Sequence, residues 1–373
     1  MAEYKIQDTT LTAIANAIRA KTGSTGTIAV SNFATQIGTI DAMPAGLATL
    51  GSGTVTAAMP TASSWISMAY GNGRFVAVAS GTSSNYAAYS TDGIRWTTAT
   101  LPNVAQWYSV AYGNGVFVAV ARATYIAAYS TDGITWMATE LPYSGYWYSV
   151  TYGNDKFVAV YRGDDSSTNS YIGAYSTDGI KWSQFTMSYT RYWQGVAYGN
   201  GKFVMIAQSS NYAMYSTNGT TWSRATMPSS ANWRYVAYGG GTFVAIVSGS
   251  TTAAYSTNGT NWTATTLPSA SSWRAITHGD GKFVVLASGS NVGAYSTDGI
   301  TWSTTTLPSS ANWYAVTYAD GKFIAAVSGS TEAAVSYDGI TWSSTGTVYN
   351  KLVNTSGTDV TANTLAAITV AHT

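Results

Sequence analysis

Hydrophobic and polar positions alternate along most of the chain in short runs, and this period of two predicts half-buried β-strands. One stretch shows the pattern in full. "WYSVAY" (Trp107–Tyr112) alternates large and small side chains, "VFVAVA" (Val116–Ala121) is rich in strand-forming residues, and "IAAYS" (Ile126–Ser130) and "ITWMATE" (Ile134–Glu140) follow. Asn-Gly and Asp-Gly pairs, which are strong hairpin signals, separate the runs. We therefore expect four antiparallel strands here.

The same unit recurs seven times along the chain. "YSTDGITW" occurs twice, and with its near-copies it ends at Trp96, Trp136, Trp182, Trp222, Trp262, Trp302 and Trp342, which are spaced by 40, 46, 40, 40, 40 and 40 residues. A leading tryptophan begins each unit: Trp65, Trp107, Trp147, Trp193, Trp233, Trp273 and Trp313. Four strands in about 40 residues is the size of one propeller blade. The sequence thus predicts an all-β fold, a seven-bladed β-propeller, with a small N-terminal α-helical module.

The turn motif that ends each unit is interpreted as structural. Its Asp can accept hydrogen bonds from backbone amides, its Gly supplies a positive φ, and its closing tryptophan can bury apolar area between neighbouring blades. Asn218 and Asn258 replace the Asp in two units, an exchange that a metal ligand or catalytic acid would not easily tolerate. The leading tryptophans, present in every unit, are expected to be core or channel lining.

The motif resembles the Asp-box of sialidase-like β-propellers, a Ser-x-Asp-x-Gly-x-x-Trp hairpin, although one residue is missing here between Asp and Gly. Over Trp65–Trp342 the whole unit is similar to a Tyr/Trp-rich propeller repeat of bacterial surface and phage proteins. This resemblance implies the fold and says little about function.

We divide the chain into an N-terminal helical attachment module and linker (1–48), the propeller (49–345) and a C-terminal extension (346–373). Thr54–Pro60 is similar to the end of a blade's fourth strand, and we expect it to help close the ring against the seventh unit. The extension alternates loosely as a strand but lacks the repeat. It could fold back or mediate oligomerisation.

The N-terminal region shows helical spacing. Leu11, Ile14 and Ile18 form an apolar stripe after a possible N-cap at Asp8. The first 40 residues resemble a module of tail- and baseplate-associated proteins from phages of Gram-positive bacteria. That resemblance implies attachment to other virion proteins through residues 1–40. An ordinary amphipathic helix packed on the propeller is the alternative.

Composition narrows the possible partners. The net charge is +1 and only 9% of residues are charged, which does not provide the clustered basic surface that nucleic-acid binding needs. No apolar run has the length of a membrane span, and the N-terminus lacks the features of a secretory signal. With no cysteine and two histidines, we expect no metal and no cofactor.

The seven units serve as controls for one another. The hairpin turns are nearly constant and should share one face, whereas the loops of the other face vary. Units 5 to 7 carry plain Ser/Ala/Gly loops, but units 3 and 4 carry aromatic ones. On this variable face we predict a ligand-binding site made of Tyr143, Tyr146, Tyr148, Arg162, Asp164, Asp165, Tyr171, Tyr189, Arg191 and Tyr192. Tyrosine offers flat apolar area with a hydroxyl. Packing of the longer loops on one another is the structural alternative.

Catalysis is not expected from the sequence. A glycosidase needs two carboxylates about 5 Å or roughly 6.5–9.5 Å apart, and the only glutamates are Glu3, Glu140 and Glu332. Arg234 and Arg274 follow the leading tryptophan in adjacent units and are expected to point into the channel, but no glutamate neighbours them in sequence.

These observations favour a virion-displayed phage or phage-like tail or fibre protein, acting outside the cell. It would recognise a host-surface glycan through the variable face and would form a homo-oligomer. A decoration protein of the same particle, a secreted bacterial lectin and a sialidase-like glycoside hydrolase are the alternatives.

Overall fold

The computed structural model describes residues 52–81, 84–162 and 171–349, and the regular elements in these ranges are β-strands. The predicted N-terminal helices and nearly all of the C-terminal extension lie outside the described residues, so these remain predictions. The strands before and after the repeats, β1 (Ser52–Thr56) and β26 (Thr345–Tyr349), pair with each other.

Four sheets each contain four consecutive antiparallel strands. Their strands are β6 (Gln106–Gly113), β7 (Val116–Arg122), β8 (Thr124–Ser130) and β9 (Met137–Gly145); β10 (Trp147–Gly153), β11 (Lys156–Tyr161), β12 (Ile172–Ser176) and β13 (Ser183–Thr186); β14 (Tyr192–Gly199), β15 (Lys202–Gln208), β16 (Ser210–Ser216) and β17 (Ser223–Ala231); and β18 (Trp233–Gly239), β19 (Thr242–Val247), β20 (Ser250–Ser256) and β21 (Thr263–Ser271).

A fifth sheet has eight strands in the order β22-β23-β24-β25-β2-β3-β4-β5. These are β22 (Trp273–Gly279), β23 (Lys282–Ser296), β24 (Ser303–Ala319), β25 (Lys322–Ser336), β2 (Ala58–Gly71), β3 (Arg74–Ala79), β4 (Tyr86–Ser90) and β5 (Thr97–Thr100). Four of them have 14 to 17 residues, because the chain stays extended where the other units have a loop. The all-β prediction is confirmed. The count of seven blades remains a prediction, because this sheet runs without a break through the last units and the first.

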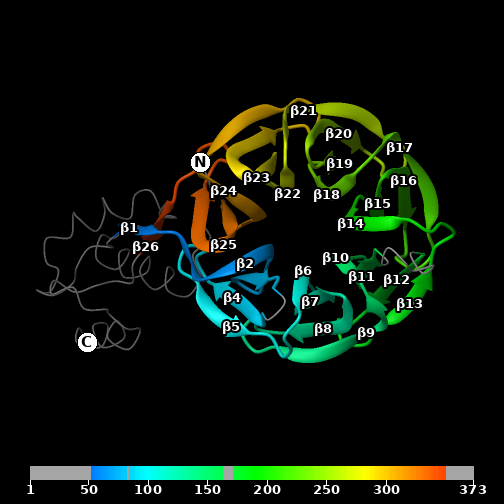
Figure 1. Cartoon of the computed structure of the whole chain (residues 1–373), viewed down its shortest axis with the longest axis horizontal. Coiled ribbons are helices and arrows are strands. Elements are labelled where there is room, and N and C mark those ends of the chain that lie inside the picture. The colour runs from blue at the N-terminus through cyan, green and yellow to red at the C-terminus, as the bar shows by residue number, and fades with distance from the viewer. Residues whose placement is uncertain (1–51, 82–83, 163–170, 350–373) are drawn as a thin grey trace, which may run out of the picture. The chain divides into compact units, whose positions relative to one another are not determined.

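The sheets of residues 55–346 are arranged in a ring, with β2, β6, β10, β14, β18 and β22 on its inner side (Figure 1). The ring closes through the segment before Trp65. Ala58 pairs with Glu332 and Ser63 with Ser330, so the first part of β2 lies against β25 from the last unit. The expected closing role of this segment is confirmed.

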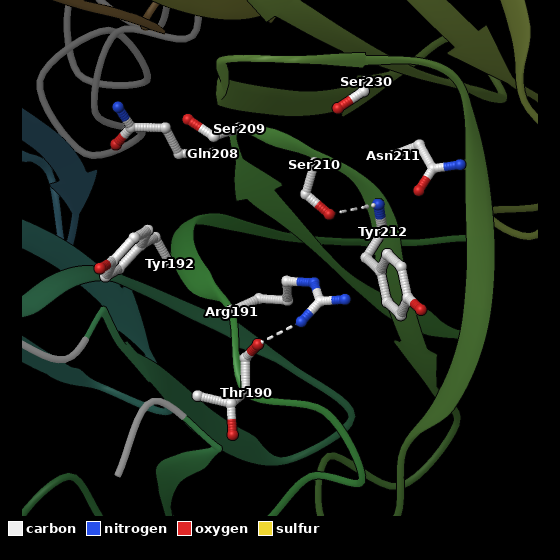
Figure 2. A pocket seen from close by; sticks show the side chains of 9 residues that line it. All are labelled: Thr190, Arg191, Tyr192, Gln208, Ser209, Ser210, Asn211, Tyr212 and Ser230. Atoms are coloured by element: carbon white, nitrogen blue, oxygen red, sulfur yellow. Dashed lines mark hydrogen bonds between the residues drawn. The ribbon is translucent and has the colours of Figure 1, made fainter. Parts of the chain in front are cut away.

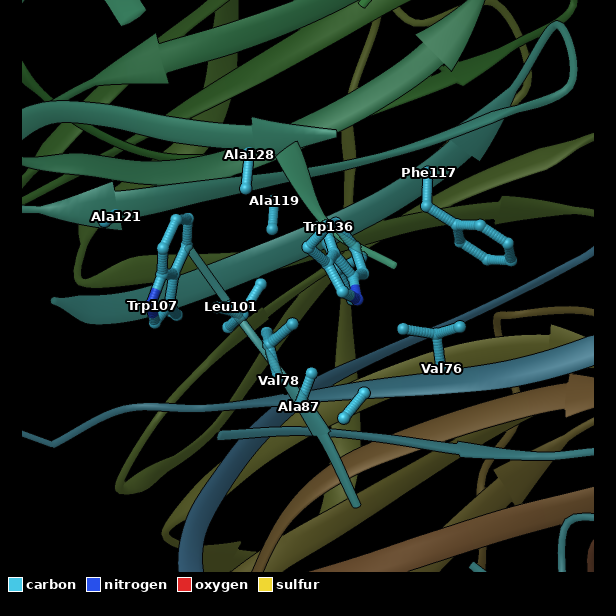
Figure 3. Packing of buried hydrophobic residues seen from close by; sticks show 12 residues of the cluster. Val76, Val78, Ala87, Leu101, Trp107, Phe117, Ala119, Ala121, Ala128 and Trp136 are labelled. Carbon is cyan, nitrogen blue, oxygen red and sulfur yellow. The ribbon is translucent and has the colours of Figure 1, made fainter. Parts of the chain in front are cut away.

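The leading tryptophans belong to the core and do not line the channel. All seven have no exposed surface. The indole N–H of Trp107, for example, donates to the carbonyl of Asn103 at 3.2 Å. Figure 3 shows Trp107 and the closing tryptophan Trp136 packed with Val76 and Val78 of the preceding unit. The hydrophobic core is therefore shared between neighbouring units, as expected for the closing tryptophan.

The turn motif is held by local hydrogen bonds. Oδ1 of Asp132 accepts the amides of Ile134 and Thr135, each at 2.8 Å, and Gly133 has a φ of 72°. In another unit Asn218 accepts the amides two and three residues later, at 3.0 and 2.9 Å. The structural interpretation of this Asp or Asn is confirmed.

Replacing Asp132 by Asn should leave stability at pH 7 within about 1 kcal/mol of the parent, whereas Asp132→Ala should cost about 1–2 kcal/mol, as for a lost helix cap. Partial burial alone would raise the pKa of Asp132, but the amide hydrogen bonds outweigh it and hold that pKa below its usual value. The ionised carboxylate therefore stabilises the fold above the usual aspartate pKa, and this stabilisation is lost as pH falls through the lowered value. Urea unfolding of both variants at pH 7 and pH 3 is the measurement. Equal losses for Asn and Ala at pH 7 would contradict the prediction.

The two kinds of hairpin turn share one face, as predicted. The side-chain amide of Asn72 donates to the carbonyl of Thr131 at 3.3 Å, and the guanidinium of Arg74 donates to the carbonyl of Asp132 at 2.8 Å. Each bond joins a first hairpin turn to the turn motif of the next unit. This constant face is used for contacts between units, which leaves the opposite face for variation.

Candidate binding face

The structure brings four of the predicted residues together near the inner rim of the ring. The guanidinium of Arg162 lies over the rings of Tyr148 and Tyr192, at 5.4 and 5.1 Å from their centroids, and donates to the Tyr148 hydroxyl at 3.2 Å. Arg122, from β7, lies over Tyr146 at 5.0 Å and over Tyr148 at 5.6 Å. Arginine and tyrosine therefore alternate in a stack, an arrangement in which cation–π contacts fix the rings.

A second group lies around β16. Arg191 lies over the ring of Tyr212 at 4.1 Å, and Arg224 lies over the same ring at 3.8 Å. Tyr189 meets Tyr212 edge-on at 5.1 Å. The Arg191 guanidinium also donates to the Thr190 carbonyl at 2.7 Å. This group holds Arg191 in place on the side of Tyr212.

The remaining predicted residues are not part of these groups. Tyr143 packs edge-on against the buried Tyr161, and Tyr171 packs against a core cluster of its own unit. For Tyr143 and Tyr171 the structure shows packing against other side chains of the protein, which was the structural alternative to a ligand-binding role. Asp164 and Asp165 lie outside the described residues.

A pocket of about 490 Å³ opens beside the second group (Figure 2). Its lining residues are Thr190, Arg191, Tyr192, Gln208, Ser209, Ser210, Asn211, Tyr212 and Ser230. Two aromatic rings, one guanidinium and a set of hydroxyl and amide groups thus surround one space. The hydroxyl and amide side chains provide hydrogen-bond donors and acceptors. Because none of these nine residues is acidic, the Arg191 guanidinium gives the lining a positive charge.

Sequence reasoning missed Tyr212, Gln208 and Asn211 in this pocket, and Arg122 and Arg224 beside the stacks. These residues lie on strands, which were treated as scaffold. A signal was present, because the position of Tyr212 is occupied by Ile126, Thr252 and Val292 in other units. A strand residue that lies next to a variable loop, and that itself varies among the units, is expected to belong to the variable face.

Comparison with protein-family models gives no match, and comparison with curated protein sequences gives none either. Solved structures of the same fold exist. Virginiamycin B lyase from Staphylococcus aureus is 13% identical, with a TM-score of 0.65 over 75% of this chain and 97% of that chain. YCF48 from Cyanidioschyzon merolae is 14% identical, with a TM-score of 0.57 over 74% and 96%. YCF48 bound to D1 peptide is 15% identical, with a TM-score of 0.56 over 78% and 97%.

These comparisons correct the prediction that the chain is not an enzyme. That prediction rested mainly on the lack of paired carboxylates, which ordinary glycoside hydrolysis needs but many other reactions do not. A structure similar to this chain is a lyase, and the variant of it described as catalytically inactive carries one histidine-to-alanine substitution. The missing carboxylate pair is therefore no ground for excluding catalysis on such a ring. At 13% identity the likeness assigns no reaction to this chain.

In the described ranges, no helix has the length and apolar character needed to cross a bilayer. The antiparallel four-stranded sheets and the similar solved structures agree on the architecture. The described part of the chain has the fold of a β-propeller.

Proposed function

We propose that the chain is a seven-bladed propeller that recognises a host-surface glycan through the pocket beside Tyr192 and Tyr212. The observation that carries the proposal is the lining of this pocket, in which Arg191 lies over the Tyr212 ring at 4.1 Å with hydroxyl and amide side chains around it. The pocket volume of about 490 Å³ lies within the range typical of small-ligand sites.

Sugars suit such a lining for two reasons. Their C–H faces pack on flat aromatic rings, and Tyr192 supplies such a ring in the pocket at a small cost in conformational entropy. Their hydroxyls need both donors and acceptors, which Gln208, Asn211 and the serines provide. The Arg191 guanidinium is held by the Thr190 carbonyl and the Tyr212 ring, so little freedom would be lost when a ligand binds.

The placement on a phage or phage-like particle rests on the resemblance of residues 1–40 to tail and baseplate modules. In this proposal these residues attach the ring to other virion proteins or to its own copies. A decoration protein that binds only virion proteins is the runner-up.

A peptide ligand is a second candidate. YCF48, a propeller similar to this chain, has been solved with a peptide bound. The stack of Arg122, Tyr146, Tyr148, Arg162 and Tyr192 offers aromatic and cationic surface that also suits a peptide chain.

Tyr192→Ala should weaken glycan binding about thirtyfold, because loss of a packed aromatic anchor costs about 2 kcal/mol. The measurement is binding of the labelled full chain to a glycan array and to intact Gram-positive cells. Tyr125→Ala is the matched control, because Tyr125 is 47% exposed and does not line the pocket.

Three results would overturn the glycan proposal. They are no glycan binding by the parent chain, unchanged binding of Tyr192→Ala, or an equal loss in Tyr125→Ala. Binding to a peptide array instead, lost in Tyr192→Ala, would favour the peptide candidate.

A further inference from the structure

A second cavity, of about 210 Å³, lies at the centre of the ring. The residue after each leading tryptophan contributes to its wall, and these residues are Ile66, Tyr108, Tyr148, Gln194, Arg234, Arg274 and Tyr314. Six of them come from the inner strands β2, β6, β10, β14, β18 and β22 (Figure 1), and Tyr314 comes from β24. The same position of each repeat thus contributes to the cavity wall, and the residue type at this position differs between units.

The cavity wall is positively charged. Arg234 and Arg274 lie on β18 and β22, which are successive inner strands, and none of the residues that line the cavity is acidic. Among the described residues the aspartates lie in the turns between strands, while Glu140 lies in β9 and Glu332 in β25. Neither arginine forms an ion pair with another described residue. Two guanidinium groups therefore face one space without a carboxylate in its wall.

The Tyr314 ring holds Arg274 in position. The Arg274 guanidinium lies over this ring, 4.9 Å from its centroid, and Tyr235 lines the same wall. The Nε of Arg274 is buried and has no hydrogen-bond partner. The Tyr108 hydroxyl is protonated at neutral pH, as for any ordinary tyrosine, and burial moves its pKa further up. Several donors are thus fixed around the cavity before any ligand arrives.

We propose that the central cavity binds one oxyanionic group, a carboxylate, sulfate or phosphate, between Arg234 and Arg274. Guanidinium groups bind such oxyanions with paired, charge-assisted hydrogen bonds. The hydroxyls of Tyr108, Tyr235 and Tyr314 provide further donors from the same wall. The cavity is large enough for a small anion with attached waters. Bound charge would also relieve the repulsion between two partly buried cations.

This site is distinct from the pocket at Arg191, and the proposal does not depend on glycan binding. The two walls meet at one hydrogen bond, in which Gln194 of the cavity donates to Gln208 of the pocket at 2.9 Å.

The test is isothermal titration of the full chain with sodium sulfate, phosphate, acetate and malonate, in chloride buffer at constant ionic strength. The parent is expected to bind at least one of these anions. Arg234→Gln and Arg274→Gln should each weaken binding roughly tenfold or more, since each removes a charge-assisted hydrogen bond. Arg274→Lys keeps the charge but loses the planar fork and should fall between the parent and Arg274→Gln.

Arg95→Gln is the control, because Arg95 lies on the turn face, where it pairs with Asp92 at 3.5 Å. Its anion affinity should equal that of the parent. Thermal unfolding provides a second readout, in which the bound anion raises the Tm of the parent more than the Tm of the two Gln variants. Binding of sulfate and phosphate alone would identify a tetrahedral anion, and binding of acetate or malonate alone a carboxylate. If no anion binds, or if both Gln variants bind as well as the parent, the proposal is wrong.

Discussion

Replacing Trp233 by alanine is expected to lower the free energy of unfolding by about 4 kcal/mol, as for other large aromatic residues in a core. Trp233 has no exposed surface, and its indole N–H donates to the Ser229 carbonyl at 3.1 Å. It belongs to a core cluster that also contains Val204 and Ile206 of β15 and Phe243 of β19. The substitution would therefore leave a cavity between two neighbouring sheets and a carbonyl without its donor.

Trp262→Ala is the matched comparison, because Trp262 lies in the same cluster and the same unit. It is 8% exposed, and its buried indole N–H has no hydrogen-bond partner, so less is lost on truncation. We expect a cost of about 3 kcal/mol. Guanidinium unfolding followed by far-UV circular dichroism measures both variants without relying on tryptophan fluorescence. The account of the core is wrong if Trp262→Ala costs more than Trp233→Ala.

Much of the fold could be predicted from the sequence because each unit is governed by short-range chemistry. The alternation of hydrophobic and polar residues predicts the strands. An Asp or Asn before a glycine predicts the turn, because the hydrogen bonds that form the turn are local. Repetition then supplies the long-range contacts, since a core that joins Val76 to Trp136 in one place must recur at the next boundary. The long strands β23 and β24 were harder to predict from the sequence, because short Ser/Gly segments such as "SGS" fit both a loop and an extended chain.

The candidate site was only partly predictable, for a different reason. Sequence comparison among the units identifies which positions vary but not where their side chains point. Tyr148 was expected on the variable face, yet it is 9% exposed and lines the central cavity. Arg234 and Arg274 were expected to face the channel, and they do line the cavity. The variation at the position of Tyr212 could be read from the sequence, but its contact with Arg191 is visible only in the three-dimensional packing.

Removal of residues 55–64 is expected to have the largest effect of all, a loss of about 5 kcal/mol in the free energy of unfolding. Two chains are compared, one beginning at Val55 and one at Trp65. The removed segment contributes Met59, which is 2% exposed and contributes about 2 kcal/mol by burial. It also makes several backbone contacts, including the pairing of Ala58 with Glu332. Each lost hydrogen bond adds about 1 kcal/mol.

The shorter chain should also change its state of association. Without the segment, β25 becomes a sheet edge with unpaired N–H and C=O groups, which is a template for pairing with another chain. We expect light scattering after gel filtration to show concentration-dependent association that the chain beginning at Val55 does not show. Both chains lack the same N-terminal residues, so the difference reports on residues 55–64 alone. Equal unfolding free energies and equal masses would mean that side-chain packing, such as that of Ile324 against the backbone of Gly93, holds the ring closed without the strand pairing.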